Sequence, residues 1–141
     1  MTAKNRLAYA VLAALSLATT HAMGAEPTED MRALAAMLAA LDAQDQNAYC
    51  KTMQAEPYAG YLGRVCQSAV QNKLKKAEDC SSEHIAQQAK SDNQQCKKMT
   101  RADFDKIALR SREAVKTFIE QARAQGVDGE KLLQSERAKL R

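Results

Sequence analysis

The chain has 141 residues, of which 45% are hydrophobic, 4% aromatic and 27% charged, and its formal net charge is +4. This length suits one domain of ordinary size and is too short for two separate hydrophobic cores. A mean hydropathy of −0.50, with only five glycines and two prolines, excludes a polytopic membrane protein and a low-complexity linker.

The first 25 residues have the pattern of a secretory signal peptide. Two basic residues precede an apolar run, and small residues follow it: Lys4 and Arg6, then residues 7–18, then Ala22, Gly24 and Ala25. The apolar run is shorter than a membrane span requires. We expect a cleaved signal peptide over residues 1–25, with cleavage after Ala22 and an uncleaved N-terminal helix as alternatives. One exported domain over residues 26–141 remains.

Removal of the signal peptide also removes most of the positive charge. Residues 1–25 contain Lys4 and Arg6 and no acidic residue, so 19 basic residues then face 17 acidic ones, a net charge of +2. A strongly basic footprint for nucleic acid is therefore absent from the expected mature chain, and we expect no nucleic-acid partner.

The first half of the mature chain predicts two main helices. Thr28 is a suitable N-cap for a helix that reaches about Ala43, because apolar residues recur at helical spacing after it. A short segment over residues 49–53 then leads to Pro57, where we expect a turn because proline disfavours helix at the preceding residue. The clearest apolar stripe follows and predicts a long helix over residues 58–79.

The second half continues the helical pattern. Ser81 or Ser82 caps a shorter helix, and residues 90–98 are polar, which predicts a loop or a frayed helix end. Thr100 with Asp103 opens a long helix that stops at Gly126, and a final short helix carries Leu132, Leu133 and Leu140. We therefore predict an all-α fold, a small irregular bundle of four to five helices stapled by two disulfides.

The four cysteines are spaced 16, 14 and 16 residues apart, at Cys50, Cys66, Cys80 and Cys96. An even count in an exported chain predicts two disulfides. A helix over residues 58–79 would hold Cys66 and Cys80 about 21 Å apart, too far for a bond. The turn at Pro57 instead places Cys50 opposite Cys66. We predict Cys50–Cys66 and Cys80–Cys96; Cys66–Cys96 with Cys50–Cys80 is the geometrically awkward alternative.

The cysteine spacing and the scarcity of histidine argue against cofactor chemistry. Structural zinc favours paired cysteine knuckles and c-type haem needs C-x-x-C-H, and the sequence has neither. Ser81, Ser82, Glu83 and His84 contain the residue types of a nucleophile and a base, but serine and glutamate at a helix start also act as a cap. We expect no metal, no cofactor and no enzymatic activity.

Two groups of side chains are candidates for a binding surface. The tyrosines Tyr49, Tyr58 and Tyr61 flank the Pro57 turn, and tyrosine suits protein interfaces, although these rings serve equally well to close the core. The basic groups comprise Lys73, Lys75 and Lys76, and then Lys97, Lys98 and Arg101. The alternatives for them are one positive patch for an acidic partner or anionic lipid, and ordinary solvated helix faces.

The run Gly60-Tyr61-Leu62-Gly63-Arg64-Val65, followed by Cys80, resembles the small exported helical immunity proteins that neutralise peptidoglycan amidases delivered by secretion systems. The resemblance covers residues 60–80 and implies a protein partner. Size, signal peptide and cysteine count also resemble accessory periplasmic proteins of conjugation or secretion machines.

We therefore expect a periplasmic or secreted protein that acts by binding another protein, without a membrane span once the signal peptide is removed. It would be an inhibitor, an immunity protein or an accessory factor. The alternative is a helical carrier or chaperone, which needs an accessible groove lined by Met31, Met37, Met53 and leucines. A small hydrolase has no constellation of residues in this sequence to support it.

Overall fold

The computed structural model describes residues 24–141, and within that range it is all-helical, with no strand. The elements are α2 (Glu29–Asp42), α3 (Gln46–Thr52), α4 (Glu56–Gln71), the short 3-10 helix η1 (Ala77–Cys80), α5 (Ser82–Lys98), α6 (Arg101–Leu109), α7 (Ser111–Ala124) and α8 (Gly129–Ala138). The predicted fold class is confirmed, with seven α-helices in the described range instead of four to five. The expected signal peptide falls on residues 1–25, of which residues 1–23 lie outside the described part.

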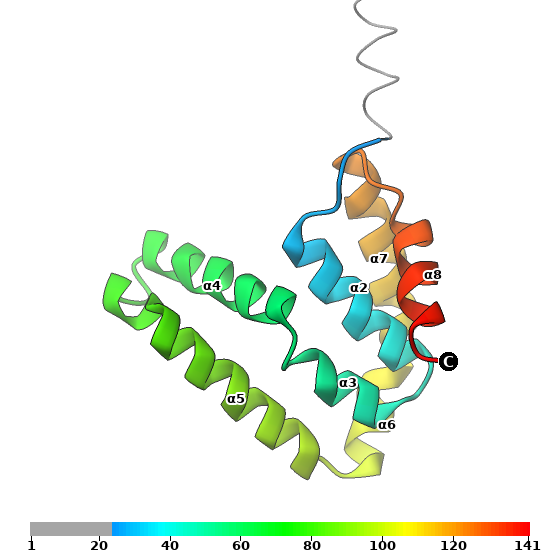
Figure 1. The fold of residues 1–141 in the computed structure, drawn as a ribbon, viewed down its shortest axis with the longest axis horizontal. Helices are drawn as coiled ribbons and strands as arrows, with labels where there is room; N and C mark the ends of the chain where they lie inside the picture. The colour runs from blue at the N-terminus through cyan, green and yellow to red at the C-terminus, as the bar shows by residue number, and fades with distance from the viewer. Residues whose placement is uncertain (1–23) are drawn as a thin grey trace, which may run out of the picture.

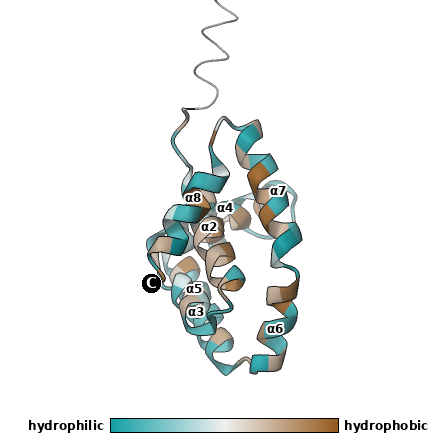
Figure 2. Ribbon diagram, turned by 90° about the vertical axis from the view of Figure 1, so that its right-hand side faces the viewer, coloured by the Kyte–Doolittle hydropathy of each residue, from teal (hydrophilic) through white to brown (hydrophobic). Residues whose placement is uncertain are grey.

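Helix α2 is the centre of the molecule. It contacts α3 and α4 on one side and α7 and α8 on the other (Figure 1). Half of its residues are buried, several of them alanines, so neighbouring helices approach it closely. In Figure 2, α2 is drawn mainly in brown tones, whereas the outer helix α7 alternates teal and brown. The core is thus one cluster built around α2, and no described helix is long and apolar enough to cross a bilayer.

Helices α4 and α5 form an arm beside this core. The two helices pack side by side and project away from α7 and α8 (Figure 1). The arm is buried mainly at its inner end, through Tyr58 on α4 and through Asn93 and Cys96 on α5, whereas Cys66 is the one buried residue of its outer half. Arg64 on α4 forms ion pairs with Glu29 and Asp30 at the start of α2. These pairs are solvent-exposed, so they orient the arm more than they stabilise it.

The helix starts follow the local sequence signals. The hydroxyls of Thr28, Ser81 and Thr100 each accept a hydrogen bond from the backbone N–H three residues later. These are the N-caps expected for α2, α5 and α6. Pro57 stands in the first turn of α4, where its missing N–H costs no intrahelical bond. The predicted N-caps are therefore confirmed, whereas the turn predicted at Pro57 is wrong, because the chain turns over residues 53–55 and α4 begins at Glu56.

The predicted end of α4 is wrong, because the helix stops at Gln71 and not near residue 79. Asn72 is the C-cap, and Lys73 adopts a left-handed conformation with φ 59°. The N–H of Lys73 donates to the carbonyl of Val70, and the N–H of Leu74 donates to that of Ala69. This hydrogen-bond pattern terminates a helix and reverses the chain. The only local signal for it is an asparagine before a lysine run.

Residues 90–98 form the second half of α5 and not a loop. The polar side chains in this stretch are used inside the protein. Asn93 is 5% exposed, its Nδ2 donates to the carbonyl oxygen of Cys50 at 2.8 Å, and its Oδ1 accepts from Gln54 Nε2 at 3.2 Å. This polar stretch therefore forms a packed helix, because the Cys50 carbonyl on α3 and the Gln54 side chain in the turn after α3 satisfy the buried amide.

The long helix predicted from Thr100 to Gly126 is broken into α6 and α7 at Arg110. Residues 101–125 contain no proline or glycine, so no local residue signals the break. The two halves bury different aromatic residues, Phe104 on α6 and Phe118 on α7, and only α7 also packs against α8. The position of the break is therefore determined by the packing of α6 and α7 against different parts of the core. The predicted end at Gly126 and the short final helix are confirmed.

The predicted disulfide pairing is also wrong. Cys50 is bonded to Cys96 and Cys66 to Cys80, with Cα–Cα distances of 5.5 and 5.7 Å. The Cys66–Cys80 bond had been excluded on the assumption of one straight helix. Because α4 ends at Gln71 and the chain reverses, Cys80 returns beside Cys66. Cys50 and Cys96 meet because α5 runs back along α4 to α3.

Candidate functional site

Two of the three tyrosines expected at a binding surface lie in the core. Tyr49 packs against Phe104 with ring centroids 5.8 Å apart, and burial raises the pKa of its hydroxyl. Tyr58 is 7% exposed, and its hydroxyl donates to Asp92 Oδ2 at 2.6 Å. Tyr61 is half-buried beside Tyr58. Tyr49 and Tyr58 are therefore structural residues, and of the three only Tyr61 is open to a partner.

The basic candidates divide in the same way. The Arg101 guanidinium stacks over the Phe104 ring and donates to the Gln44 carbonyl oxygen at 3.0 Å and to Asp105 at 2.9 Å. It thus joins the start of α6 to the end of α2. Lys97 and Lys98, in contrast, are exposed in the last turn of α5. Lys98 and Tyr58 line the same open hollow of about 590 Å³.

The two lysine groups do not form one patch. Lys73, Lys75 and Lys76 precede α5, whereas Lys97 and Lys98 end it. The 17 residues of α5 separate them by about 24 Å at 1.5 Å per residue. The first group is followed directly by Glu78 and Asp79, which offset its charge. Of the two alternatives for the basic groups, a single positive patch is therefore wrong.

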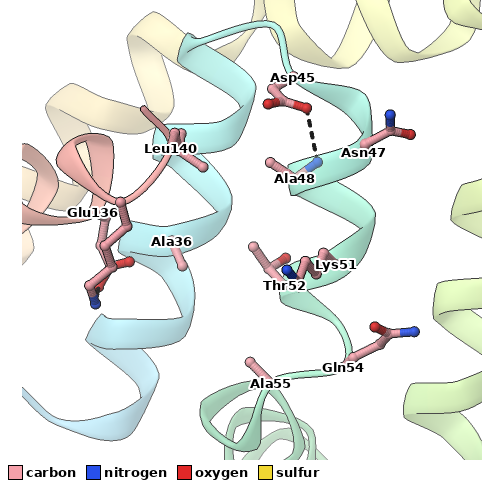
Figure 3. Close-up of a pocket in the computed structure, with 11 residues that line it drawn as sticks. Ala36, Asp45, Asn47, Ala48, Lys51, Thr52, Gln54, Ala55, Glu136 and Leu140 are labelled. Atoms are coloured by element: carbon pink, nitrogen blue, oxygen red, sulfur yellow. Dashed lines mark hydrogen bonds and ion pairs between the residues drawn. The ribbon is translucent and has the colours of Figure 1, made fainter.

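A hollow of about 780 Å³ lies between α2, α3 and α8 (Figure 3). Its walls are largely small or polar, and the structure shows a partner for each of its charged residues except Lys51. Asp45 accepts from the Ala48 N–H at 2.9 Å as the cap of α3, and Glu136 pairs with Lys139 at 2.8 Å. This cleft therefore offers few groups free to select a ligand.

The groove between α4 and α5 has a different character. It has a volume of about 660 Å³ and an aliphatic floor contributed by both helices, with polar residues around it. The floor consists of Leu62, Val65, Ala69 and Ile85, and the rim includes Lys75, Asp79, His84, Gln87, Gln88 and Ser91. Val65 is 49% exposed. The Cys66–Cys80 disulfide lies in the wall and fixes the outer end of the groove.

Ser81 and His84 stand at the outer end of this groove and form the one contact that resembles a catalytic pair. Ser81 Oγ lies 2.7 Å from His84 Nδ1 and also accepts the His84 N–H at 3.3 Å. Both residues are exposed within one helical turn, and no carboxylate in residues 24–141 is hydrogen-bonded to the ring. The contact is that of an N-cap. A nucleophile would also need an oriented base.

Between residues 24 and 141, no group of three or more His, Cys, Asp or Glu side chains is placed to hold a metal ion. All four cysteines are consumed in disulfides. The α4–α5 groove is thus the described site that folding explains least, because part of its aliphatic floor remains exposed.

The comparisons with known proteins add no identity. No family model matches the chain, and neither a curated protein nor a solved structure matches it. The function is therefore argued from the groove.

Proposed function

We propose that this is an exported, non-enzymatic binding protein that holds another protein in the groove between α4 and α5. The occupant that fits is a helix of the partner carrying aliphatic side chains on one face. Such a helix lays its apolar stripe into a groove with an aliphatic floor, while its polar edges meet the surrounding amides and hydroxyls.

The observation that carries the proposal is the exposed aliphatic floor of a rigid arm. Val65 is half exposed although it lies between two packed helices. As binding candidates the sequence singles out the neighbouring tyrosines, and it does not single out Leu62 or Val65 individually. Both belong to residues 60–65, the run that resembles exported immunity proteins.

The two disulfides support export, because such bonds persist in an oxidising compartment such as the bacterial periplasm. Within that compartment the proposal covers an inhibitor or immunity protein and an accessory factor of a secretion or conjugation system. A stable complex with a peptidoglycan amidase that loses its activity would select the first. A complex with a component of a transport machine would select the second.

The test is site-directed crosslinking of the disulfide-bonded protein. A photoreactive amino acid is placed at Val65 and the protein is added to periplasmic extract of cells that export it. We expect one stoichiometric adduct with the partner. Unlabelled protein should compete with its formation, whereas unlabelled protein that carries Val65→Glu should no longer compete. Val65 is half exposed, so the new carboxylate is tolerated by the fold and acts on binding by opposing an apolar partner.

Leu109→Glu is the matched control, because Leu109 is an 80% exposed aliphatic residue on α6, outside the groove. This competitor must still displace the adduct. Equal displacement by both variants would place the interface elsewhere. The absence of a stoichiometric adduct from Val65 would refute the proposed function.

A carrier remains the second candidate, on one observation. The groove expected for it is not formed, because Met31 and Met53 are buried in the core and Met37 packs against it. An apolar hollow of about 530 Å³ lies instead at the α6–α7 break, between Leu41, Met99, Ile107 and Ala114, with Lys106 and Arg110 at its edge. Lipid co-purified in amounts equal to the protein would favour this function.

A further inference from the structure

The residues just before α2 lie against the corner where α7 turns into α8. The backbone N–H of Ala25 donates a hydrogen bond to the carbonyl oxygen of Gly126, with an N–O distance of 3.1 Å. Gly24, Ala25 and Pro27 also line a pocket of about 350 Å³ together with residues of the corner and of α8: Val127, Asp128, Lys131, Leu132 and Ser135. The chain is therefore docked on the domain from Ala25 onward.

The acceptor of that hydrogen bond lies where positive charge is favoured. Gly126 follows the C-cap of α7 and has φ 75°. The turn already provides donors for the carbonyls of Ala122 and Arg123, from the N–H groups of Val127 and Gly126. The Gly126 carbonyl lies just beyond these, at the end of a helix that carries partial negative charge. An ammonium donor would bind it more strongly than an uncharged amide.

The sequence supplies a way to put an ammonium group there. Ala22-Met23-Gly24 has small residues at its first and third positions, which is the pattern that leader peptidases cleave after. Cleavage after Ala25, our expectation from the sequence, would remove the nitrogen that donates to Gly126. Cleavage after Ala22 would leave Met23 and Gly24 in front of it.

We propose that the leader is removed by hydrolysis of the Gly24–Ala25 bond, and that the new α-ammonium group of Ala25 binds the Gly126 carbonyl at the end of α7. A leader peptidase of the exporting cell directs water onto the Gly24 carbonyl carbon. Gly24 leaves as the carboxylate end of the leader, and the Ala25 nitrogen takes up a proton. This inference rests on the expected export but not on the α4–α5 groove, so either can fail alone.

The direct test uses the full chain with its own leader, produced in an exporting bacterium and recovered from the periplasm. Intact mass and sequencing of the N-terminal peptide should give Ala25 as the first residue. A chain that begins at Met23 or Glu26, or that keeps its leader, overturns the inference.

Two leader variants test the recognition pattern. Ala22→Arg places a large charged residue three positions before the cut and should reduce processing at Ala25 at least tenfold. Met23→Arg is the matched control, because the position between the two small residues is free in the pattern. Normal processing of Ala22→Arg at Ala25 would contradict the assignment.

The contact itself is tested with chains whose first residue is set by a cleavable tag. A chain that starts at Glu26 lacks the donor, and its unfolding equilibrium constant should rise about twofold to tenfold over that of the Ala25 chain, the range for one hydrogen bond. The Met23 chain keeps the N–H without the charge and should fall between the two. Equal unfolding constants for the Ala25 and Glu26 chains would exclude the docked terminus.

Discussion

At the scale of single residues, polar side chains of α5 join the two helices of the arm and bond the arm to α3. Tyr58 on α4 donates to Asp92, and Asp92 also accepts from Gln88 at 2.7 Å. Asn93 on the same turn bonds to the backbone of α3. The inner end of the arm is thus fixed by hydrogen bonds at a point where the aliphatic packing of the core has ended. The aliphatic residues at the outer end of the arm are therefore not needed to fix its position.

Tyr58→Phe is expected to lower the free energy of unfolding by about 1.5 kcal/mol, because it removes a hydrogen bond to a carboxylate while the ring still packs. Burial, and then the hydrogen bond and the charge of Asp92, raise the pKa of the Tyr58 hydroxyl. The unfolded tyrosine loses its proton near pH 10, whereas the folded one keeps it. The free energy of unfolding therefore falls as pH rises above about 10.

Chemical denaturation at pH 7 and over pH 9 to 11 measures both effects. Tyr58→Phe should remove part of the alkaline decline, and Tyr49, whose pKa is also raised, should account for part of the rest. Tyr61→Phe is the control, since no hydrogen bond of its hydroxyl is seen among residues 24–141. An alkaline decline that is identical in Tyr58→Phe and the unmodified protein would contradict this account of Asp92.

At the scale of elements, the sequence predicts helix starts far better than helix ends. Thr28, Ser81 and Thr100 act on the turn that follows them, so their effect is local and visible in the sequence. The ends of α4 and α6 depend on where the core stops. The apolar pattern continues to Leu74, past the last residue of α4, and Leu74 is left 78% exposed. Periodicity alone could not reveal this.

Alanine substitutions at two glycines should change stability in opposite directions, because one glycine lies at a close contact between helices and the other does not. A Cβ on Gly129, at the start of α8, would lie 3.0 Å from Ala122 Cβ and 3.2 Å from the Ile119 Cα, so α8 would have to move off α7. Gly129→Ala should cost about 1 to 2 kcal/mol of unfolding free energy. Gly63→Ala, within α4 and with nothing within 4 Å of its Cβ, should add about 0.5 to 1 kcal/mol.

Urea denaturation of the two variants at neutral pH gives the measurement. The same substitution is made in both, so any general effect of replacing glycine in the unfolded chain cancels in the comparison. A stabilising Gly129→Ala would show that α7 and α8 are not in close contact.

At the scale of the whole molecule, the disulfides decide what the arm can do. Their number follows from the composition, but their pairing required the reversal after Gln71, which no cysteine spacing encodes. The candidate site was missed for the same reason. Leu62, Val65 and Ile85 line one groove because α4 and α5 pack side by side and Cys66–Cys80 closes the outer end of the arm, whereas one helix over residues 58–79 would keep Cys66 and Cys80 apart.

The two disulfides should therefore contribute differently to the free energy of unfolding. Cys50–Cys96 closes a separation of 46 residues between cysteines that are 4% and 2% exposed, and chain entropy predicts a contribution of about 4 kcal/mol. Cys66–Cys80 closes 14 residues at the outer end of the arm, for which the same relation gives about 3 kcal/mol. Replacing Cys50 and Cys96 by alanine also removes buried volume, so this pair should lose more stability.

Denaturation of the two double alanine variants, each compared with the fully reduced protein, measures the difference. Peptide mapping without reductant should first recover Cys50 joined to Cys96 in the unmodified chain. The Cys66→Ala/Cys80→Ala variant should remain folded yet lose crosslinking from Val65, because the end of the groove is no longer fixed while α2 and its neighbours are unchanged. If this variant keeps full crosslinking, the bond stabilises the chain without shaping the groove, and the partner contacts a surface that the free arm already presents.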